Sequence, residues 1–231
     1  MEQLRKHTGV FIALAVILSW TGLLLFHFFW KADPFHPWTW LGILLQTHLF
    51  TGLFITAHDA MHGSVSPGNP RLNHLIGRLC AIGFMFNSYR ILRPKHYEHH
   101  RFVGTEQDPD FHGEKEGFWF WYLKFVREYV RWPQILLAAI TFNLLLHLVG
   151  IAELNLILYW VIPSILSTLQ LFYFGTYLPH MGEHNNVHKS HSQSKNHLWA
   201  FLSCYFFGYH FEHHDKPRTP WWELWKVKEA Q

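Results

Sequence analysis

Long apolar segments alternate with polar, histidine-rich segments along this chain. Four of the apolar segments approach or reach the roughly 20 residues that an α-helix needs to cross the hydrocarbon core of a bilayer. Their approximate bounds are residues 10–30, 38–60, 133–150 and 154–178. The first segment is too long for the core of a signal peptide and shows no cleavage site of small residues, so we expect it to remain as a span. The pattern predicts an all-α integral membrane protein with about four transmembrane helices.

Shorter apolar or amphipathic segments lie between and after these spans. The piece Leu75–Phe86 is too short to cross a bilayer, which favours an interfacial or re-entrant helix. The segment Gly117–Trp132 mixes aromatic and basic residues, as helices on a membrane surface do. One aromatic helix is expected over Leu198–His214, and Pro163 is expected to kink the fourth span. The sequence has no internal repeat or low-complexity tract, so we interpret residues 1–231 as a single domain.

The basic residues determine the expected orientation of the spans. With four spans, both termini, the segment between the second and third spans and the C-terminal region share one side of the membrane. Every Lys and Arg residue of the chain except Lys31 lies on that side. Because loops rich in Lys and Arg remain in the cytoplasm, we expect a multi-pass protein of the cell (inner) membrane. Both termini and the histidine clusters would lie on the cytoplasmic side of the lipid bilayer.

Composition narrows the classes of protein that remain. Hydrophobic residues make up 49% of the chain and charged residues only 15%, which excludes a disordered chain. The formal net charge of +3 gives no reason to expect nucleic-acid binding. Two cysteines, Cys80 and Cys204, are too few for a disulfide framework and lie in apolar surroundings. The 20 histidines are the feature that points to chemistry.

Three clusters of histidines have helical spacing. They are His58 and His62 in HDAMH, His96, His99 and His100 in HYEHH, and His210, His213 and His214 in HFEHH. On a helix these spacings put the imidazoles on one face, so we expect each helix to offer two or three nitrogens to a common point. Imidazole suits iron, copper, zinc or nickel, and the lack of thiolates argues against iron–sulfur or structural zinc sites. The clusters predict a metal centre.

Eight imidazoles exceed the ligand shell of a single ion, which indicates two metal ions. His180, at the end of the fourth span, is the best candidate for a ninth ligand, and His188 is the next. Six acidic residues lie near the clusters: Asp59, Glu98, Asp108, Asp110, Glu212 and Asp215. A metal-bound histidine usually donates its second N–H to such a carboxylate. Glu98 and Glu212 either serve in that way or face solvent, and Asp108 and Asp110 either orient ligands or shape a turn.

Redox metals on imidazoles beside apolar spans favour the activation of dioxygen for attack on a C–H bond of a lipid. A hydrolytic dizinc site would normally include bridging carboxylates and take a polar substrate. The sequence has no glycine-rich nucleotide fingerprint, so electrons are expected from a separate carrier protein. The basic residues Arg90, Arg93, Lys95 and Arg101 suit an acidic donor, and equally follow from the positive-inside rule or from lipid headgroups.

Four motifs, in order between about residues 50 and 225, carry a resemblance to a known family. They are HDAMHG, RILRPKHYEHHRFVGTEQDPDF, FYFGTYLPH and CYFFGYHFEHH. They resemble the bacterial and cyanobacterial β-carotene ketolases, within the membrane fatty-acid hydroxylase and desaturase group that has three histidine boxes. The boxes alone indicate the wider group, whereas FYFGTYLPH and the DPDF continuation narrow the resemblance to ketolases.

The resemblance implies a non-haem di-iron enzyme that uses O₂ and a ferredoxin-type electron donor. It implies oxidation of C4 of a β-ionone ring to a ketone through successive hydroxylations and loss of water. The substrate would be a carotenoid, with β-carotene giving echinenone and canthaxanthin, and hydroxylated carotenoids giving astaxanthin. By position, iron would be held by His58, His62, His96, His99, His100, His210, His213 and His214, with His180 as an extra ligand and His188 as a looser match.

Other functions remain open at this point. A carotenoid ring hydroxylase, a fatty-acid desaturase or a fatty-acid hydroxylase of the same group would share the histidine boxes and differ in the shape of the pocket. A membrane electron carrier with bis-histidine haem is a reading from another class. Haem-binding pairs usually face each other within spans, whereas these clusters lie at the ends of spans and outside them. A metal transporter would need ionisable groups at the middle of the bilayer.

Overall fold

The computed structural model describes residues 2–111, 113, 117–182 and 184–231 of the chain. The secondary structure of these residues is helical, with no strand among them. Four helices are long and apolar enough to cross a membrane: His7–Phe29, Pro37–Met61, Trp132–Val149 and Glu153–His180. The predicted all-α membrane architecture and its four spans are therefore confirmed.

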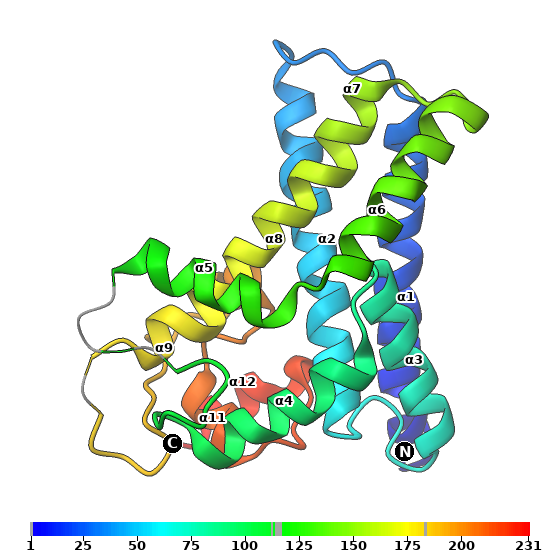
Figure 1. Cartoon of the computed structure of the whole chain (residues 1–231). Helices are drawn as coiled ribbons and strands as arrows, with labels where there is room; N and C mark the ends of the chain where they lie inside the picture. Colours follow the sequence, from blue (N-terminus) through cyan, green and yellow to red (C-terminus); the bar gives the residue numbers. More distant parts are fainter. Residues whose placement is uncertain (1, 112, 114–116, 183) are drawn as a thin grey trace.

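The four spans form an elongated bundle, and the remaining helices gather at one end of it (Figure 1). Helices α1 (Glu2–Phe29), α2 (Pro37–Met61) and α6 (Trp132–Leu144) run along the bundle beside the fourth span. The gathered helices are α3 (Pro70–Gly83), α4 (Tyr89–Phe102), α5 (Phe118–Tyr129), α10 (His197–Cys204), α11 (His210–Asp215) and α12 (Trp221–Glu229). Both chain termini lie at this end, which is also where the histidine boxes are found.

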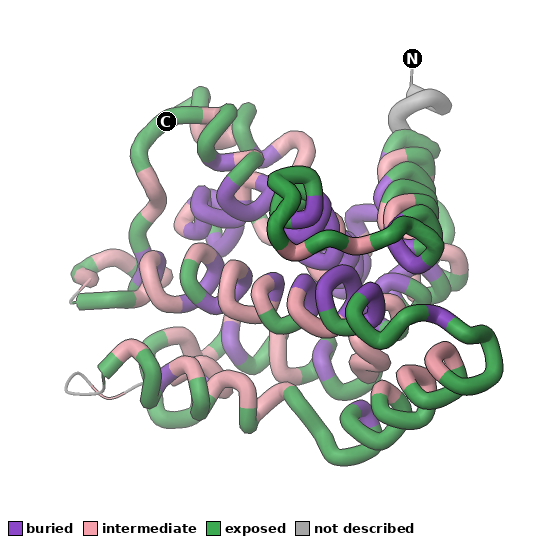
Figure 2. The backbone as a smooth tube through the Cα atoms, turned by 90° about the horizontal axis from the view of Figure 1, so that it is seen from above, coloured by how far each residue is buried: buried purple, intermediate pink, exposed green. Residues whose placement is uncertain are grey.

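Helix α2 is the central span. It packs against α1, α3 and α8, and 61% of its most apolar window is buried, against 22% for the first span and 6% for the third. Small residues allow this packing, because a Cβ added at Gly42 would lie 2.7 Å from Nε2 of His27, and one at Gly52 would lie 2.5 Å from the Tyr205 hydroxyl. Viewed along the bundle, buried segments gather at the centre and exposed ones lie at the periphery (Figure 2).

The fourth span is a continuous helical run with two π-helical turns. It comprises α7 (Glu153–Leu156), the π turn η2 (Ile157–Val161), α8 (Ile162–Phe172), the π turn η3 (Tyr173–Tyr177) and α9 (Leu178–His180). Pro163 is the second residue after η2, so the departure from α-helical geometry falls where the proline removes a backbone donor. Each π turn adds a residue and so rotates the side chains that follow it, which makes η3 part of what aims His180.

Asn155 ties the fourth span to the end of the first. Its buried Nδ2 donates to the carbonyl oxygens of His27 (2.7 Å) and Trp30, which lack helical partners at the end of α1. We expect Asn155→Ala to lower the free energy of unfolding in detergent by about 1 kcal/mol, as interhelical hydrogen bonds in membranes do. The measurement is a thermal or denaturant transition, with Asn143→Ala as the control because Asn143 bonds only within its own helix. Equal transitions for the two variants would remove this role from Asn155.

The prediction of one aromatic helix over residues 198–214 is wrong. The chain instead forms α10 and α11, separated by a turn in which Tyr205 and Phe206 have φ values of 49° and 63°. Tyr205 is buried against α2, with its hydroxyl at Gly52 and its ring stacked on His48 at a centroid distance of 4.3 Å. This packing offsets the cost of the left-handed backbone and redirects the chain before the last histidine box.

The two predicted surface helices are present with shifted bounds. Helix α3 starts earlier than expected, at Pro70, because the side chain of Asn69 caps it by accepting a hydrogen bond from the Leu72 amide. Helix α5 exposes Trp119 and Phe120 while it buries Trp121, the arrangement of a helix with one face toward lipid.

Candidate metal centre

Nine histidines converge on two adjacent points at the end of the bundle that holds the termini. The first histidine group consists of His58, His62, His96, His100 and His213, and the second of His99, His180, His210 and His214. Within each group, one ligand atom from every residue lies within 4.8 Å of those from all the others. The structure therefore brings together all eight histidines of the three boxes, and it adds His180.

Each HxxHH box is divided between the two groups. Helix α4 gives His96 and His100 to the first group and His99 to the second. Helix α11 does the reverse, giving His210 and His214 to the second group and His213 to the first. The expectation that each box addresses a common point holds for HDAMH, whose His58 and His62 both join the first group, and is wrong for the two HxxHH boxes. At 3.6 residues per turn, positions i and i+4 lie about 40° apart around the helix, whereas i+3 and i+4 lie about 100° apart.

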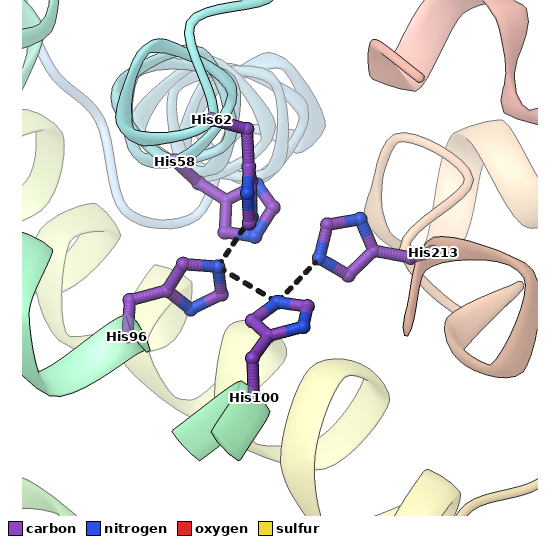
Figure 3. Close-up of side chains that lie close together, drawn as sticks. All are labelled: His58, His62, His96, His100 and His213. Carbon is purple, nitrogen blue, oxygen red and sulfur yellow. Dashed lines mark hydrogen bonds between the residues drawn. The ribbon is translucent and has the colours of Figure 1, made fainter. Parts of the chain in front are cut away.

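The first group is a row of facing imidazole nitrogens (Figure 3). Successive Nε2 atoms are 2.6 Å apart between His62 and His96, 3.1 Å between His96 and His100, and 3.1 Å between His100 and His213. His58 stands beside the row, its ring centroid 4.3 Å from that of His96. Its Nε2 atom is buried and finds no hydrogen-bond partner among the described residues.

The second group has the same construction. The Nε2 atom of His214 is 3.2 Å from that of His99 and 3.0 Å from that of His210, which is 2.9 Å from that of His180. The outer members are fixed by their other nitrogen, since Nδ1 of His180 donates to the Lys189 carbonyl (2.9 Å) and Nδ1 of His99 donates to Asp108 (2.9 Å). Their Nε2 atoms consequently carry lone pairs, which is the tautomer that binds a metal.

Burial keeps most of these imidazoles neutral. Desolvation lowers the pKa of His96, His210, His213 and His214 well below the usual histidine value. It lowers the pKa of His62 to about 4, with a contribution from Arg218, and that of His100 to about 2. Neutral imidazole is the form that coordinates metals, so the site is prepared for ligation at physiological pH.

Carboxylates orient His99, as one of the two sequence interpretations proposed. Asp108 accepts its Nδ1–H, and Asp110 lies 3.7 Å from the same nitrogen and accepts a hydrogen bond from the Tyr129 hydroxyl (2.7 Å). Burial lowers the pKa of His99, but the hydrogen bond to Asp108 and the charges of both aspartates outweigh it, so the net shift is upward. Burial raises the pKa of Asp110 to about 6. The pair acts as an anchor for one ring of the second group.

The two candidate glutamates are not found against the histidines. Glu98 is exposed on α4. Glu212 is buried and accepts hydrogen bonds from Lys228 (2.8 Å) and from the hydroxyl of Ser192, which holds the C-terminal helix and the preceding loop onto α11. The i+2 position of each box points away from the face that carries the imidazoles, so Glu98 faces solvent and Glu212 has a structural role.

Asp59 is one of the acidic residues that the sequence places near the clusters, but the sequence interpretation assigned it no role. Its carboxylate lies 3.2 Å from Nδ1 of His58 and also accepts a hydrogen bond from the backbone N–H of Trp221 (2.8 Å). Asp59 thus connects a ring of the first group to the start of α12. The signal available in the sequence was only its position next to His58, which on a helix does not by itself predict contact.

His188 lies outside both groups. Its Nε2 atom is 3.8 Å from a carboxylate oxygen of Asp215, and its ring centroid is 5.8 Å from that of His214. His188 lies on the loop between the fourth span and α10. Because it belongs to neither group, we exclude it from the proposed ligands.

The donor set fits two transition-metal ions. Four and five imidazoles surround the two points. Each Nε2 atom has one in-plane site, for a hydrogen or a lone pair, so those of His96 and His214, with two Nε2 neighbours each, cannot hydrogen-bond to both, whereas a cation accepts lone pairs from all of them. The orphaned Nε2 atom of His58 points to the same conclusion. A bis-histidine haem takes two imidazoles, and each of these groups has four or five.

An apolar cavity of about 80 Å³ adjoins both groups. Its wall includes His58 and His96 of the first group and His99 and His210 of the second. The other wall residues are mostly apolar and aromatic, among them Phe54, Phe84, Phe125, Tyr129 and Phe207. A small apolar group in this cavity would lie next to histidines of both groups and would be shielded from water.

Comparison with known sequences shows the family to which this chain belongs. The family model of the fatty acid desaturases matches residues 35–230. The chain belongs to the fatty acid desaturase family. Within that family it is 39% identical, over 224 residues, to the beta-carotene ketolase of Paracoccus sp. (strain N81106 / MBIC 01143), with 94% of this chain and 90% of the relative aligned.

Other relatives agree. The beta-carotene ketolase of Paracoccus sp. (strain PC1) is 38% identical over 94% of this chain and 90% of its own length. The zeaxanthin 4-ketolase of Chlamydomonas reinhardtii is 36% identical over 96% of this chain, which spans about half (53%) of that algal protein. No solved structure matches. This member of the desaturase family is therefore an oxidoreductase of the β-carotene ketolase group.

Proposed function

We propose that this desaturase-family protein is a carotenoid ketolase that converts C4 of a β-ionone ring to a ketone. The observation that carries the proposal is the apolar cavity with histidines of both groups in its wall. The ketolases that it resembles over most of their length indicate the class of substrate. The relatives' names include both beta-carotene and zeaxanthin, so ordinary and hydroxylated rings are both candidates.

We propose that the nine histidines of the two groups hold two iron ions. When bound, these ions supply the activation of O₂ that oxidation of an unactivated C–H bond requires. Each hydroxylation consumes one O₂, two electrons and two protons, and releases one water. Two hydroxylations at C4 give a geminal diol, which loses water to leave the ketone. Electrons would come from a ferredoxin-type donor.

The residues around the cavity orient the metal ligands and bind the substrate. Asp108 and the Lys189 carbonyl hold His99 and His180 with Nε2 toward the second metal position. Phenylalanines such as Phe54 and Phe207 give flat apolar walls that suit a ring and its conjugated chain and that exclude water. Water exclusion protects a reactive centre from unproductive turnover.

The donor is expected on the basic face at the histidine end of the bundle, which we propose to be cytoplasmic in the inner membrane. Arg90, Arg93 and Arg101 are exposed there. Lys95 is mostly buried and paired with Glu128, so we do not include it in this face.

Expression in cells that accumulate β-carotene tests the proposal. We expect keto-carotenoids by chromatography with mass spectrometry, and none from a His99→Ala variant that still inserts into the membrane. Hydroxylated products alone would make the protein a ring hydroxylase. Unchanged pigment, in cells with folded protein and a working ferredoxin system, would indicate acyl-lipid chemistry. A haem Soret band in the purified protein would contradict the di-iron site.

A further inference from the structure

A second cavity lies next to the one at the metal groups. It has a volume of about 560 Å³, and we call it the outer cavity. The two cavities share five wall residues, which we call the neck: Phe84, Asn87, Val126, Val130 and Thr168. Since the inner cavity of about 80 Å³ is far smaller than a carotenoid, the rest of such a molecule must lie elsewhere, and the neck leads into the outer cavity.

The outer cavity is bounded by the third and fourth spans and opens toward lipid. Ile135 on α6 and Ile165 on α8 both line it, and they are 61% and 57% exposed. Among the residues of α6, only Gln134 is buried, so this helix is loosely packed against its neighbours. Exposed residues at the rim, within two membrane-spanning helices, place the mouth of the cavity at the hydrocarbon core.

Unusual backbone geometry and hydrogen bonds hold one side of the neck in place. Beside Phe84, two consecutive residues that are not glycine, Met85 and Phe86, have φ values of 53° and 59°. Backbone in this region persists only where its surroundings hold it, and it is concentrated at functional sites. Here Asn87 holds it, because its Nδ2 donates to the Phe84 carbonyl (2.9 Å) while its Oδ1 accepts from the Gln134 side chain (2.6 Å).

A hydrogen bond also holds the opposite side of the neck. The Tyr122 and Thr168 hydroxyls are hydrogen-bonded at 2.9 Å, which links α5 to the fourth span. The neck is thus held by hydrogen bonds on two sides, between the outer cavity and the two histidine groups. This arrangement suits an elongated apolar molecule that has one end at the histidine groups and the rest in the outer cavity.

We propose that the substrate enters laterally from the bilayer, between α6 and the fourth span. Its terminal ring passes the neck to reach the histidine groups, and its polyene chain remains in the outer cavity. This inference rests on the proposed function and specifies its path. A carotenoid is dissolved in the hydrocarbon core, so this route never exposes it to water.

The polar alternative is a cavity of about 160 Å³ beside His62 at the histidine end of the bundle. Its wall contains Asn73, His74, Arg93 and Ser66. Passage there would desolvate polar and charged groups without replacing their hydrogen bonds, which disfavours it for an apolar chain.

A pair of adjacent tryptophan substitutions on α6 tests the route. Ala138 lines the outer cavity, whereas its neighbour Leu137 is 47% exposed and does not line it. In purified protein in lipid nanodiscs, we expect Ala138→Trp to lower both bound β-carotene and the rate of its oxidation by about tenfold or more, with metal content unchanged. Leu137→Trp is expected to stay near the unsubstituted protein in all three measurements. Ile165→Trp blocks the cavity from the facing helix and should behave like Ala138→Trp.

The outcomes separate the route from the function. If the unsubstituted protein oxidises β-carotene and Ala138→Trp and Ile165→Trp match Leu137→Trp, the lateral route is wrong and the function stands. Loss of metal in both Ala138→Trp and Ile165→Trp would also overturn the route, since the proposed route requires that the outer cavity be separate from the metal site. If the unsubstituted protein neither binds nor oxidises a carotenoid, the proposed function itself fails.

Discussion

Replacement of His96 with alanine is expected to abolish keto-carotenoid formation and to lower the metal content from about two ions to about one per chain. His96 is central in the first group, with Nε2 2.6 Å from that of His62 and 3.1 Å from that of His100. The second group takes only His99 from the α4 box and does not include His96, so it should keep its ion. His214→Ala is expected to have the reciprocal effect. Metal analysis of purified protein and pigment analysis of the cells check both variants.

His188→Ala is the matched control for these substitutions. The loop that carries His188 lies near the second group, but its ring is outside both sets of ligands. We expect this variant to retain its metal and its activity. Loss of one ion from His188→Ala, or full metal content in His96→Ala, would contradict the assignment of ligands to the two groups.

Replacement of Asp108 with asparagine is expected to weaken metal binding or activity by about 10–100-fold. The two carboxylate oxygens of Asp108 accept the Nδ1–H of His99 (2.9 Å) and the backbone N–H groups of Gly104 (3.2 Å) and Asp110 (2.9 Å). An amide loses the negative charge and turns one acceptor into a donor that faces a donor. The tautomer and direction of the His99 ring would no longer be fixed. Chelator competition measures the change in metal affinity.

The control for this change is Glu98→Gln, which removes the same charge from the same region at an exposed position. We expect metal affinity and turnover to be unaffected. Equal losses in the two variants would mean that a general reduction of negative charge, and not the orientation of His99, is responsible.

The spans were predictable because their signal is local. A bilayer demands an uninterrupted apolar run of a certain length, and each of the four spans, for example Pro37–Met61, contains such a run. The helix break at Tyr205 was not predictable, since it depends on the fit of this side chain against Gly52 and His48 of another span. The aromatic composition around it fits one helix as well as two.

The convergence of the eight box histidines was predictable from the chain alone, since their i, i+3 and i+4 spacing is a property of a single helix. Their division into two groups, the inclusion of His180 without His188, and the contact between Asp59 and His58 became visible only in the folded chain. The division into groups and the places of His180 and His188 depend on the direction in which helices far apart in the sequence meet. That direction is determined by close packing at Gly42 and Gly52 and by the rotation that the π turns of the fourth span introduce, and neither leaves a periodic pattern in the sequence.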